Sequence, residues 1–400
     1  QDKKTVEFPT ITPEEESKEH VPSSDVSEND NDTQGNSGQN VNHTNPSEQQ
    51  ESSNQGTGED PVHSKDTVVI ETSIDADIKD FTNMYLEMRT IANQANRSMV
   101  TVTSIMKGVD WFRNEYETTK ETSGVIVADN GAEFLILVSW DKIKDASSLE
   151  VTFFNSVNTE ATLQSYDTDL NIAVIAVKLK DIPDQNRKDI KPATLGESFA
   201  LVIGTPIIAL GNPNGYVGSM ELGFITSKGI NSYITDNKIE LFNTDINDNK
   251  NSDGVIINLK GEVIGIITRV LKDETNDEVN TVIGISRIKK IIESLVNNQD
   301  LVYFGIKGMD MTPEALEKAD IAYGVSVMEV EPESPALAAG LKSGDIILNV
   351  NETPISSMNS FFNIISLYEP KTTINITIKR GTQNMVKDLT LEVTLEKKNH

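Results

Sequence analysis

Short apolar runs follow one another along the chain between residues 99 and 286. They read MVTVTSI, SGVIVA, EFLILVS, LEVTFF, IAVIAVKL, PIIALG, GFITSKGI, GVIINL, EVIGIIT and TVIGIS. Each run is rich in Val and Ile and is bounded by Gly, Asn, Asp or Pro, as is typical of strands separated by turns. Many short strands at this spacing predict an all-β barrel or sandwich.

Helical spacing occurs on both sides of this β region. In residues 73–98 the apolar positions recur every three or four residues, with Ser73 and Asp75 as candidate N-terminal caps. These positions are Ile74, Ile78, Phe81, Met84, Tyr85, Met88 and Ile91. They predict a helix with one buried stripe. The run RIKKIIESLVNNQ, residues 287–299, predicts a second helix that joins the β region to the C-terminal part of the chain.

A separate module begins near residue 301. Its predicted strands lie in LVYFGIKGM, in YGVSVMEVEPESPALAAGLKSGDIILNVNETPI around a small helix, and in TINITIKRG and LTLEVTL. The run SMNSFFNIISLY predicts a second amphipathic helix. Five or six strands and two helices in about one hundred residues are typical of an α+β domain.

The first 66 residues differ in composition from the rest. They contain fifteen acidic and four basic residues, so they contribute −11 to the net charge of −27. Ser, Asn, Gln, Asp and Glu dominate, and too few apolar residues are present to form a core. We therefore expect a disordered acidic linker or stalk at 1–67. It precedes an N-terminal helix at 68–97, the β region at 98–296 and the C-terminal module at 297–400.

Composition excludes several classes of function. A net charge of −27 argues against nucleic-acid binding, which needs concentrated Lys and Arg, and against electrostatic attachment to anionic lipid. The chain has no Cys, so disulfides, thiolate zinc sites and cysteine nucleophiles are excluded. No metal or cofactor motif is present, so we expect no cofactor. The chain begins with Gln, and we expect that a signal peptide or membrane anchor preceded it.

The C-terminal module resembles a PDZ domain. The resemblance lies in residues 334–355, SPALAAGLKSGDIILNVNETPI, and covers nearly the whole module. It implies that a peptide's C-terminal carboxylate would bind a loop of backbone N–H groups and that the peptide would add a strand beside that loop. In this sequence the implied loop is Tyr303, Phe304, Gly305 and Ile306. Phe361 and Ile365, one helical turn apart, are expected to face the last side chain of the peptide or to be core residues.

The β region resembles the HtrA (DegP/DegS-like) branch of trypsin-like serine proteases. The resemblance runs from about 98 to 292 and lies in SGVIVADNGAEFLILVS, YDTDLNIAVIAVKL, ATLGES, IIALGNPNG and NTDINDNKNSDGVIINLKGEVIGI. It implies a mainly β fold, with a trypsin-like double β-barrel before the α+β PDZ domain. It also implies an extracytoplasmic protein of the bacterial cell envelope and serine endopeptidase chemistry.

The residues expected for that chemistry have changed. A catalytic triad needs a serine nucleophile, a histidine base and a carboxylate that orients the histidine. By the resemblance the histidine position is Ser139, and residues 64–399 contain no His at all. The aspartate position is Asn171, for which we expect a structural hydrogen bond. Counted back from Asn258 and Gly261, Ser252 keeps the nucleophile position, whereas counting forward from Thr244 and Asp245 places Asp253 there. Lys250 replaces a glycine that normally supplies an oxyanion-hole N–H, and the carboxylate of Asp253 adds negative charge where an oxyanion would develop.

Two functions of different classes follow from these changes. One is a binding protein: an HtrA-like pseudoprotease that binds peptides, unfolded polypeptides or protein C-termini and acts as a scaffold or regulator in envelope protein quality control. The alternative is a weak serine endopeptidase in which a lysine serves as base to Ser252, with Lys142, Lys228 and Lys250 as candidates. An exposed lysine stays protonated near pH 7, which disfavours the alternative.

The resemblance also implies partners. Members of this family form trimers through the segment before the first barrel, here the helix around residues 78–91, so a homo-trimer or a complex with a partner protease is expected. The aromatic residues of 110–112, DWF, and Tyr116 are a second candidate contact site. The usual burial of Trp and Phe favours packing of these residues onto the barrel instead.

Overall fold

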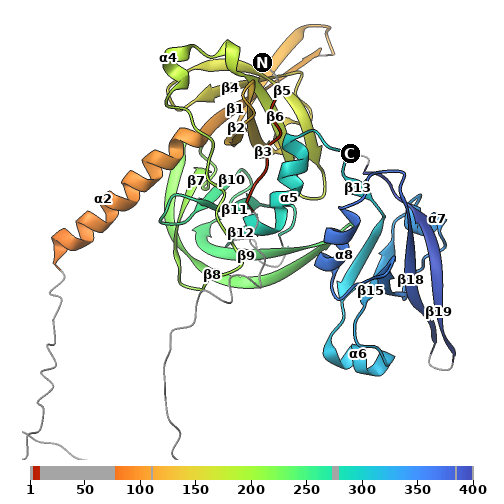
Figure 1. Ribbon diagram of the computed structural model, residues 1–400. Helices are drawn as coiled ribbons and strands as arrows, with labels where there is room; N and C mark the ends of the chain where they lie inside the picture. Colours follow the sequence, from red (N-terminus) through yellow and green to blue (C-terminus); the bar gives the residue numbers. More distant parts are fainter. Residues whose placement is uncertain (1–2, 10–76, 110, 273–278, 383–384, 399–400) are drawn as a thin grey trace, which may run out of the picture.

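The predicted strands pair into two closed six-stranded barrels, which are followed by an α+β domain (Figure 1). The structure is a computed structural model that describes residues 3–9, 77–109, 111–272, 279–382 and 385–398. The fold is therefore mainly β, with a double β-barrel followed by the α+β domain that resembles a PDZ domain, as the sequence predicted.

The first barrel has the strand order β1-β2-β3-β6-β5-β4. Its strands are β1 Met99–Val109, β2 Glu115–Asp129, β3 Glu133–Ser139, β4 Ser148–Phe153, β5 Asn158–Asp167 and β6 Ile172–Lys178. β3 is apolar from Phe134 to Val138, where both of its faces are buried. Phe134 and Ile136 pack in the core of this barrel, whereas Leu135 and Leu137 pack in a core shared with the second barrel.

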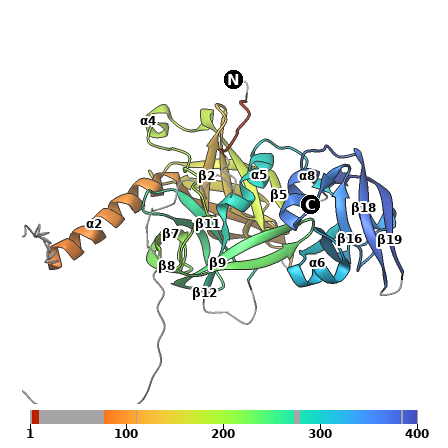
Figure 2. The same ribbon diagram turned by 60° about the horizontal axis from the view of Figure 1, so that its bottom comes forward.

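The second barrel repeats this arrangement, with the strand order β10-β11-β12-β9-β8-β7. Its strands are β7 Pro206–Asn212, β8 Ser219–Ile234, β9 Asn237–Asn247, β10 Asp253–Ile257, β11 Val263–Thr268 and β12 Val279–Gly284. The long strands β8 and β9 form a hairpin that extends out of the barrel toward the PDZ domain (Figures 1 and 2). Helix α5, Ile285–Val296, follows β12 and buries Ile288, Ile292 and Leu295 against the shared core.

Short helical segments precede or connect these strands. They are η1 Asn96–Ser98, α3 Trp140–Ile143, η2 Leu179–Asp181 and α4 Asp184–Arg187.

The PDZ domain is built on a sheet with the order β14-β15-β16-β18-β19, and β17 pairs with β16. Its strands are β13 Val302–Tyr303, β14 Ile306–Asp310, β15 Val325–Val330, β16 Ile346–Val350, β17 Thr353–Pro354, β18 Thr373–Thr382, β19 Met385–Thr394 and β20 Glu396–Lys397. The two predicted helices are α7, Pro335–Ala338, and α8, Met358–Ile365. A further helix, α6, Pro313–Ala319, was not predicted; Thr312 caps it and Pro313 stands at its first position.

The predicted N-terminal helix contains α2, Ile78–Ala95, which begins with a capping box at Asp77. Residues 68–76 lie outside the described residues. The candidate caps Ser73 and Asp75 lie outside the described residues. The predicted buried stripe is exposed over most of its length, because the first turns project away from the barrels (Figure 1). Only the end of the helix, around Ala92, packs against the shared core.

Residues 3–9 differ from the predicted disordered linker. They lie in an extended conformation along the first barrel and α5. Val6 forms two hydrogen bonds with the side chain of Asn297, and Val6 and Phe8 pack against the shared core. Apolar packing, backbone hydrogen bonds and an ion pair between Lys3 and Glu133 together attach this segment. The remainder of the predicted linker, residues 10–67, lies outside the described residues.

The aromatic residues between β1 and β2 are exposed, so the expectation that they pack onto the barrel is wrong. Trp111 is 96% exposed and Phe112 is 81% exposed, at the end of a hairpin in which Gly108 pairs with Tyr116. No helix of the described residues is both long and apolar enough to cross a membrane.

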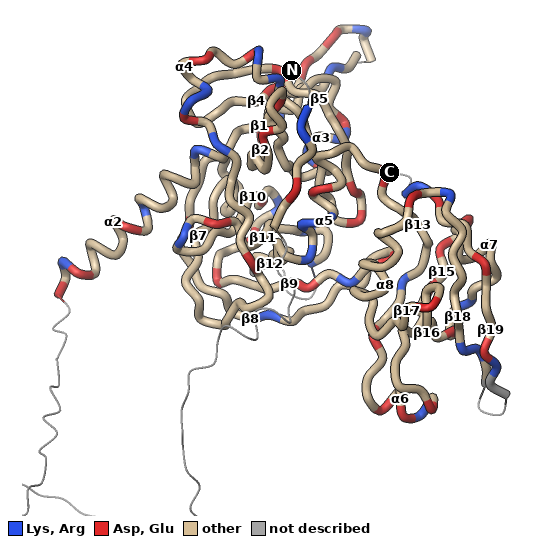
Figure 3. The backbone as a smooth tube through the Cα atoms, viewed as in Figure 1, with Lys and Arg blue, Asp and Glu red and all other residues tan. Residues whose placement is uncertain are grey.

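Charged residues of both signs are spread over the barrels, α2 and the PDZ domain (Figure 3). Since residues 1–66 contribute −11 of the total −27, residues 67–400 have a net charge of −16. The sequence after residue 66 is therefore acidic in its own right, which argues against nucleic-acid binding in the same way.

Candidate functional site

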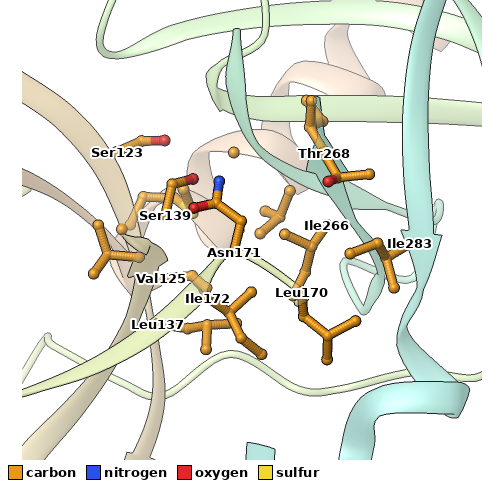
Figure 4. A pocket seen from close by; sticks show the side chains of 16 residues that line it. Ser123, Val125, Leu137, Ser139, Leu170, Asn171, Ile172, Ile266, Thr268 and Ile283 are labelled. Atoms are coloured by element: carbon orange, nitrogen blue, oxygen red, sulfur yellow. The ribbon is translucent and has the colours of Figure 1, made fainter. Parts of the chain in front are cut away.

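Two of the three predicted triad positions lie in one cavity between the barrels. Ser139, at the end of β3, and Asn171, just before β6, line a cavity of about 30 Å³ whose opposite wall includes Ile266 and Thr268 of β11 (Figure 4). That volume is large enough to hold a water molecule. Ser252 does not line this cavity, so the structure does not bring the three positions together in it.

Asn171 is held in place by its own hydrogen bonds. Its backbone has φ 55°, a left-handed conformation that Asn tolerates better than most residues. Its Oδ1 accepts from the backbone N–H of Asp141, and its Nδ2 donates to Asp141 Oδ1, both at 2.8 Å. The side chain therefore fixes the start of α3, in a structural role of the kind predicted from the sequence. The neighbouring acid, Asp169, forms an ion pair with Lys398 at 2.8 Å.

Ser139 cannot act as a general base in place of a histidine. It stands at the N-cap of α3 without a capping hydrogen bond, and its hydroxyl has no affinity for a proton near pH 7. The next residue, Trp140, stacks on Tyr166 with ring centroids 3.8 Å apart and turns its ring to that neighbour. Neither side chain offers a general base.

Ser252 is buried, with 3% of its surface exposed. Its Oγ donates to the carbonyl oxygen of Pro213 at 2.7 Å and accepts from the backbone N–H of Asn249 at 3.0 Å. A nucleophilic serine must give its proton to a base, and a backbone carbonyl cannot take one. In this conformation the two hydrogen bonds of the hydroxyl hold the loop 249–252 against Pro213, which follows β7.

Asp253 connects the two barrels. Its carboxylate accepts hydrogen bonds from the hydroxyls of Thr122 and Ser123 on β2, and only 2% of the residue is exposed. Burial raises the pKa of the Asp253 carboxyl, and the hydrogen bonds from Ser123 and Thr122 oppose this rise. The sequence does not indicate this link between the barrels, because the hydroxyls that hold Asp253 are 130 and 131 residues away.

The candidate lysine bases have other partners or are exposed. Lys142 lies 3.4 Å from Asp141, and Lys228 donates to the carbonyl oxygen of Leu201 at 2.7 Å. Lys250 is exposed. The hydrogen-bond partners of Ser252 Oγ are Pro213 and Asn249, so the geometry favours none of the three lysines as its base.

The predicted carboxylate-binding loop of the PDZ domain holds a carboxylate that belongs to the chain itself. The backbone N–H groups of Phe304, Gly305 and Ile306 donate to the side chain of Asp236 at 2.8 to 3.0 Å. Gly305 has φ 95°, and a Cβ there would lie 2.2 Å from the Cβ of Ser334, so this loop requires glycine. Tyr303 precedes the three donors without donating to the carboxylate.

Asp236 was missed in the sequence. It stands at the tip of the β8–β9 hairpin, in YITDNKIE, where an Asp is an ordinary turn residue. No pattern within the hairpin indicates that its partner lies 68 to 70 residues further along the chain.

Phe361 and Ile365 of α8 are fully buried in the PDZ core. The ring of Phe361 meets that of Phe304 edge-on, with centroids 5.1 Å apart. This packing agrees with the core role left open by the sequence. A role toward the last side chain of a peptide stays a prediction.

Comparison with known proteins identifies both parts of the chain. Residues 122–266 match the family described as trypsin-like peptidase domain, and residues 266–395 match the PDZ domain. The periplasmic serine endoprotease DegP of Salmonella typhimurium is 28% identical over 288 residues, which are 67% of this chain and 59% of that protein. The serine protease Do-like HtrB of Bacillus subtilis is 30% identical over 293 residues, 67% of this chain and 62% of that protein. The chain thus spans about three fifths of the length of these relatives.

Solved structures have the same fold. The HtrA-type protease AlgW with decapeptide aligns with a TM-score of 0.58 at 20% identity, over 78% of this chain and 99% of that one. The serine endoprotease from Yersinia pestis aligns with a TM-score of 0.52 at 25% identity, over 78% of this chain and 98% of that one.

Proposed function

This chain belongs to the HtrA family of trypsin-like proteins with a PDZ domain, and from that premise we propose that it is a pseudoprotease that binds peptides. In this proposal the barrels provide a scaffold, and the PDZ domain binds protein C-termini or unfolded polypeptides. The relatives named above are proteases, so the proposal is that the binding functions of the family remain while hydrolysis does not.

One observation carries the proposal: the Ser252 hydroxyl has no base. Residues 64–399 contain no His, and the Ser252 proton is donated to the carbonyl of Pro213. Loss of the triad histidine or serine alone costs on the order of 10⁶-fold in kcat in a well-studied serine protease. The side chain of Asn171, committed to Asp141, supports the same conclusion.

A place outside the cytoplasm, in the bacterial envelope, is part of the proposal. DegP of Salmonella typhimurium is described as periplasmic. A chain without Cys is compatible with export and excludes a disulfide framework. We propose a role in envelope protein quality control, in which this chain acts as a scaffold or regulator, as a homo-trimer or beside an active protease.

The experiment that tests the proposal compares the wild-type chain with Ser252→Ala. Both are incubated with an unfolded protein substrate and with a serine-reactive phosphonate probe, and DegP of Salmonella typhimurium serves as the positive control. We expect no cleavage and no labelling by either form, while a melting transition shows that each is folded. Labelling or cleavage that is lost in Ser252→Ala would show that Ser252 is activated, and the weak endopeptidase would then be the better description.

A further inference from the structure

The tip of the β8–β9 hairpin presents a carboxylate to the PDZ domain in the manner of a peptide end. Ile234 pairs with Asn237, so the turn consists of Thr235 and Asp236. The two oxygens of the Asp236 carboxylate accept from the three successive N–H groups of the loop described above. A nest of successive backbone N–H groups is an anion site, and here the anion is supplied from within the chain.

The backbone of Asp236 also pairs with the PDZ domain. Its N–H donates to the carbonyl oxygen of Ile306 at 2.7 Å, on the first residue of β14. A bound peptide that adds a strand would use the same carbonyl. Tyr233, three residues earlier on β8, packs against the PDZ core. The hairpin thus occupies both the anion site and the start of the strand edge.

The rest of the hairpin lies against the two elements that would flank a peptide. β8 contacts β14, and β9 contacts both β14 and α8. Figures 1 and 2 show the end of the hairpin beside α8. Lys238 of β9 forms an ion pair with Asp310 at the end of β14, at 2.8 Å. The space between β14 and α8 is therefore covered by the barrel hairpin.

The turn itself does not need a carboxylate. Asp236 has φ 61°, a conformation that Asn and Gly also adopt readily. Yet the carboxyl is fully buried, and burial raises its pKa to about 6 although three backbone N–H groups and Lys398 oppose that rise. A buried carboxylate is unfavourable unless it is hydrogen-bonded, so its partners in the loop explain why it is tolerated.

A cavity lies in the contact between the hairpin and the PDZ domain. A cavity of about 60 Å³ lies beside Asp236, with Phe362 and Tyr368 of the PDZ domain and Ile291 of α5 among its lining residues. Domain interiors leave few voids larger than a water molecule. This cavity is consistent with two surfaces that can separate without unfolding either barrel or PDZ domain.

We propose that Asp236 is an internal ligand of the PDZ domain, so that a free C-terminal carboxylate binds the 304–306 loop only after the β8–β9 hairpin has left it. The inference rests on the proposed peptide-binding function and adds a regulatory contact to it. A ligand whose binding-competent state is only partly populated binds more weakly in proportion to that population. Removal of the Asp236 carboxylate raises the apparent affinity for such peptides.

The test compares the full-length wild-type chain with Asp236→Asn. Asn keeps the left-handed turn, but it has one acceptor oxygen and places an NH₂ group against backbone donors. Asp129→Asn is the matched control, because Asp129 is an exposed turn acid of the first barrel that accepts from Gly131. The probes are two pools of fluorescein-labelled decapeptides with random last four residues, one with free carboxyl termini and one with amidated termini, read by fluorescence anisotropy.

We expect Asp236→Asn to bind the free-carboxyl pool at least about tenfold more tightly than the wild type, with Asp129→Asn unchanged. The affinity for the amidated pool should be the same in Asp236→Asn and in the wild type. Hydrogen exchange of the 304–306 amides should be faster in Asp236→Asn than in the wild type without peptide. Lys238→Gln leaves Asp236 and the loop intact and should bind the free-carboxyl pool more tightly than the wild type, by a smaller factor. It is the variant to measure if Asp236→Asn does not fold.

The outcomes separate the inference from the function on which it rests. Equal binding of the free-carboxyl pool by the wild type, Asp236→Asn and Lys238→Gln would overturn the internal ligand and leave peptide binding standing. Absence of binding by all three folded proteins would overturn peptide binding and, with it, the inference.

Discussion

At the scale of single residues, the nucleophile loop depends on backbone space as much as on side-chain chemistry. Gly254 follows Asp253 and pairs with Gly211 across β7 and β10. It has φ 118°, and a Cβ at this residue would lie 2.2 Å from the carbonyl oxygen of Leu210. Any side chain at this position would therefore separate the strands that support Ser252 and Asp253.

We predict that Gly254→Ala destabilises the chain by about 3 kcal/mol, from backbone strain and overpacking together. Gly204→Ala is the control, because Gly204 has φ 86° but a Cβ at that residue would have nothing within 4 Å. Gly204→Ala should lower the free energy of unfolding by about 1 kcal/mol, because it adds backbone strain without overpacking. Urea unfolding of both variants measures the difference, and equal losses would show that the close approach to Leu210 does not matter.

Residue identity also limited what the sequence could reveal about the site. The missing His is visible by inspection, and the resemblance implies that Asn171 stands where an acid is expected. The direction of the Ser252 hydroxyl is not, because it depends on the carbonyl of Pro213, 39 residues earlier in the chain. Changes of residue type can be read from a sequence, whereas a hydrogen bond between distant segments needs the fold.

At the scale of elements, α5 joins the parts of the molecule. Its apolar face packs into the core shared by both barrels, and Asn297 just after its end holds the segment 3–9. Gln164 of β5 donates to the carbonyl oxygens of Leu295 and Val296 at the end of the helix. Because α5 contacts both barrels, a destabilising substitution in α5 should lower the stability of both barrels.

We predict that Ile292→Ala lowers the free energy of unfolding by about 2–5 kcal/mol, since Ile292 is fully buried. Ile78→Ala is the control: it makes the same change on α2, where the side chain is 75% exposed, and it should stay within about 0.5 kcal/mol of the wild type. Thermal unfolding followed by circular dichroism distinguishes the two. A small loss in Ile292→Ala would mean that α5 is not part of the cooperative core.

The elements most accurately predicted were those whose burial is fixed by local pattern. β3 and β6 are apolar on both faces and were evident as strands. The stripe of α2 has the spacing of a buried helix, but its first turns contact nothing in the described parts of the chain that would bury Ile78 or Phe81. Periodicity shows that a face is apolar and cannot show what covers it.

At the scale of the whole molecule, the arrangement of barrels and PDZ domain depends on contacts that no local pattern contains. Lys398, near the end of the chain, forms ion pairs with Asp167 and Asp169 of the first barrel. Asp236 joins the second barrel to the PDZ domain. Each of these pairs unites segments at least 68 residues apart, so the sequence predicted the domains but not the contacts between them.

The pKa of Asp236 makes the contact between hairpin and PDZ domain depend on pH. The carboxyl has a pKa of about 6 when docked and an ordinary value of 3.8 when exposed. The docked state therefore binds the proton more tightly, and docking is strengthened as the pH falls from about 6 toward about 4. As the pH rises through about 6, the ionised carboxylate bears the full unfavourable effect of burial, and docking weakens.

We therefore predict that the affinity for peptides with a free carboxyl terminus increases about tenfold between pH 5 and pH 7 in the wild type. The C-terminal carboxyl of the peptide stays ionised over this range, because its ordinary pKa is about 3.5. Asp167, Lys290, Asp300 and Lys398 line the cavity beside Asp236 and remain in Asp236→Asn. That variant should therefore lose the part of the pH dependence that Asp236 supplies and keep any part due to these four groups. Anisotropy titrations of both proteins at pH 5, 6 and 7 measure the difference, and parallel pH profiles would show that Asp236 does not control access to the loop.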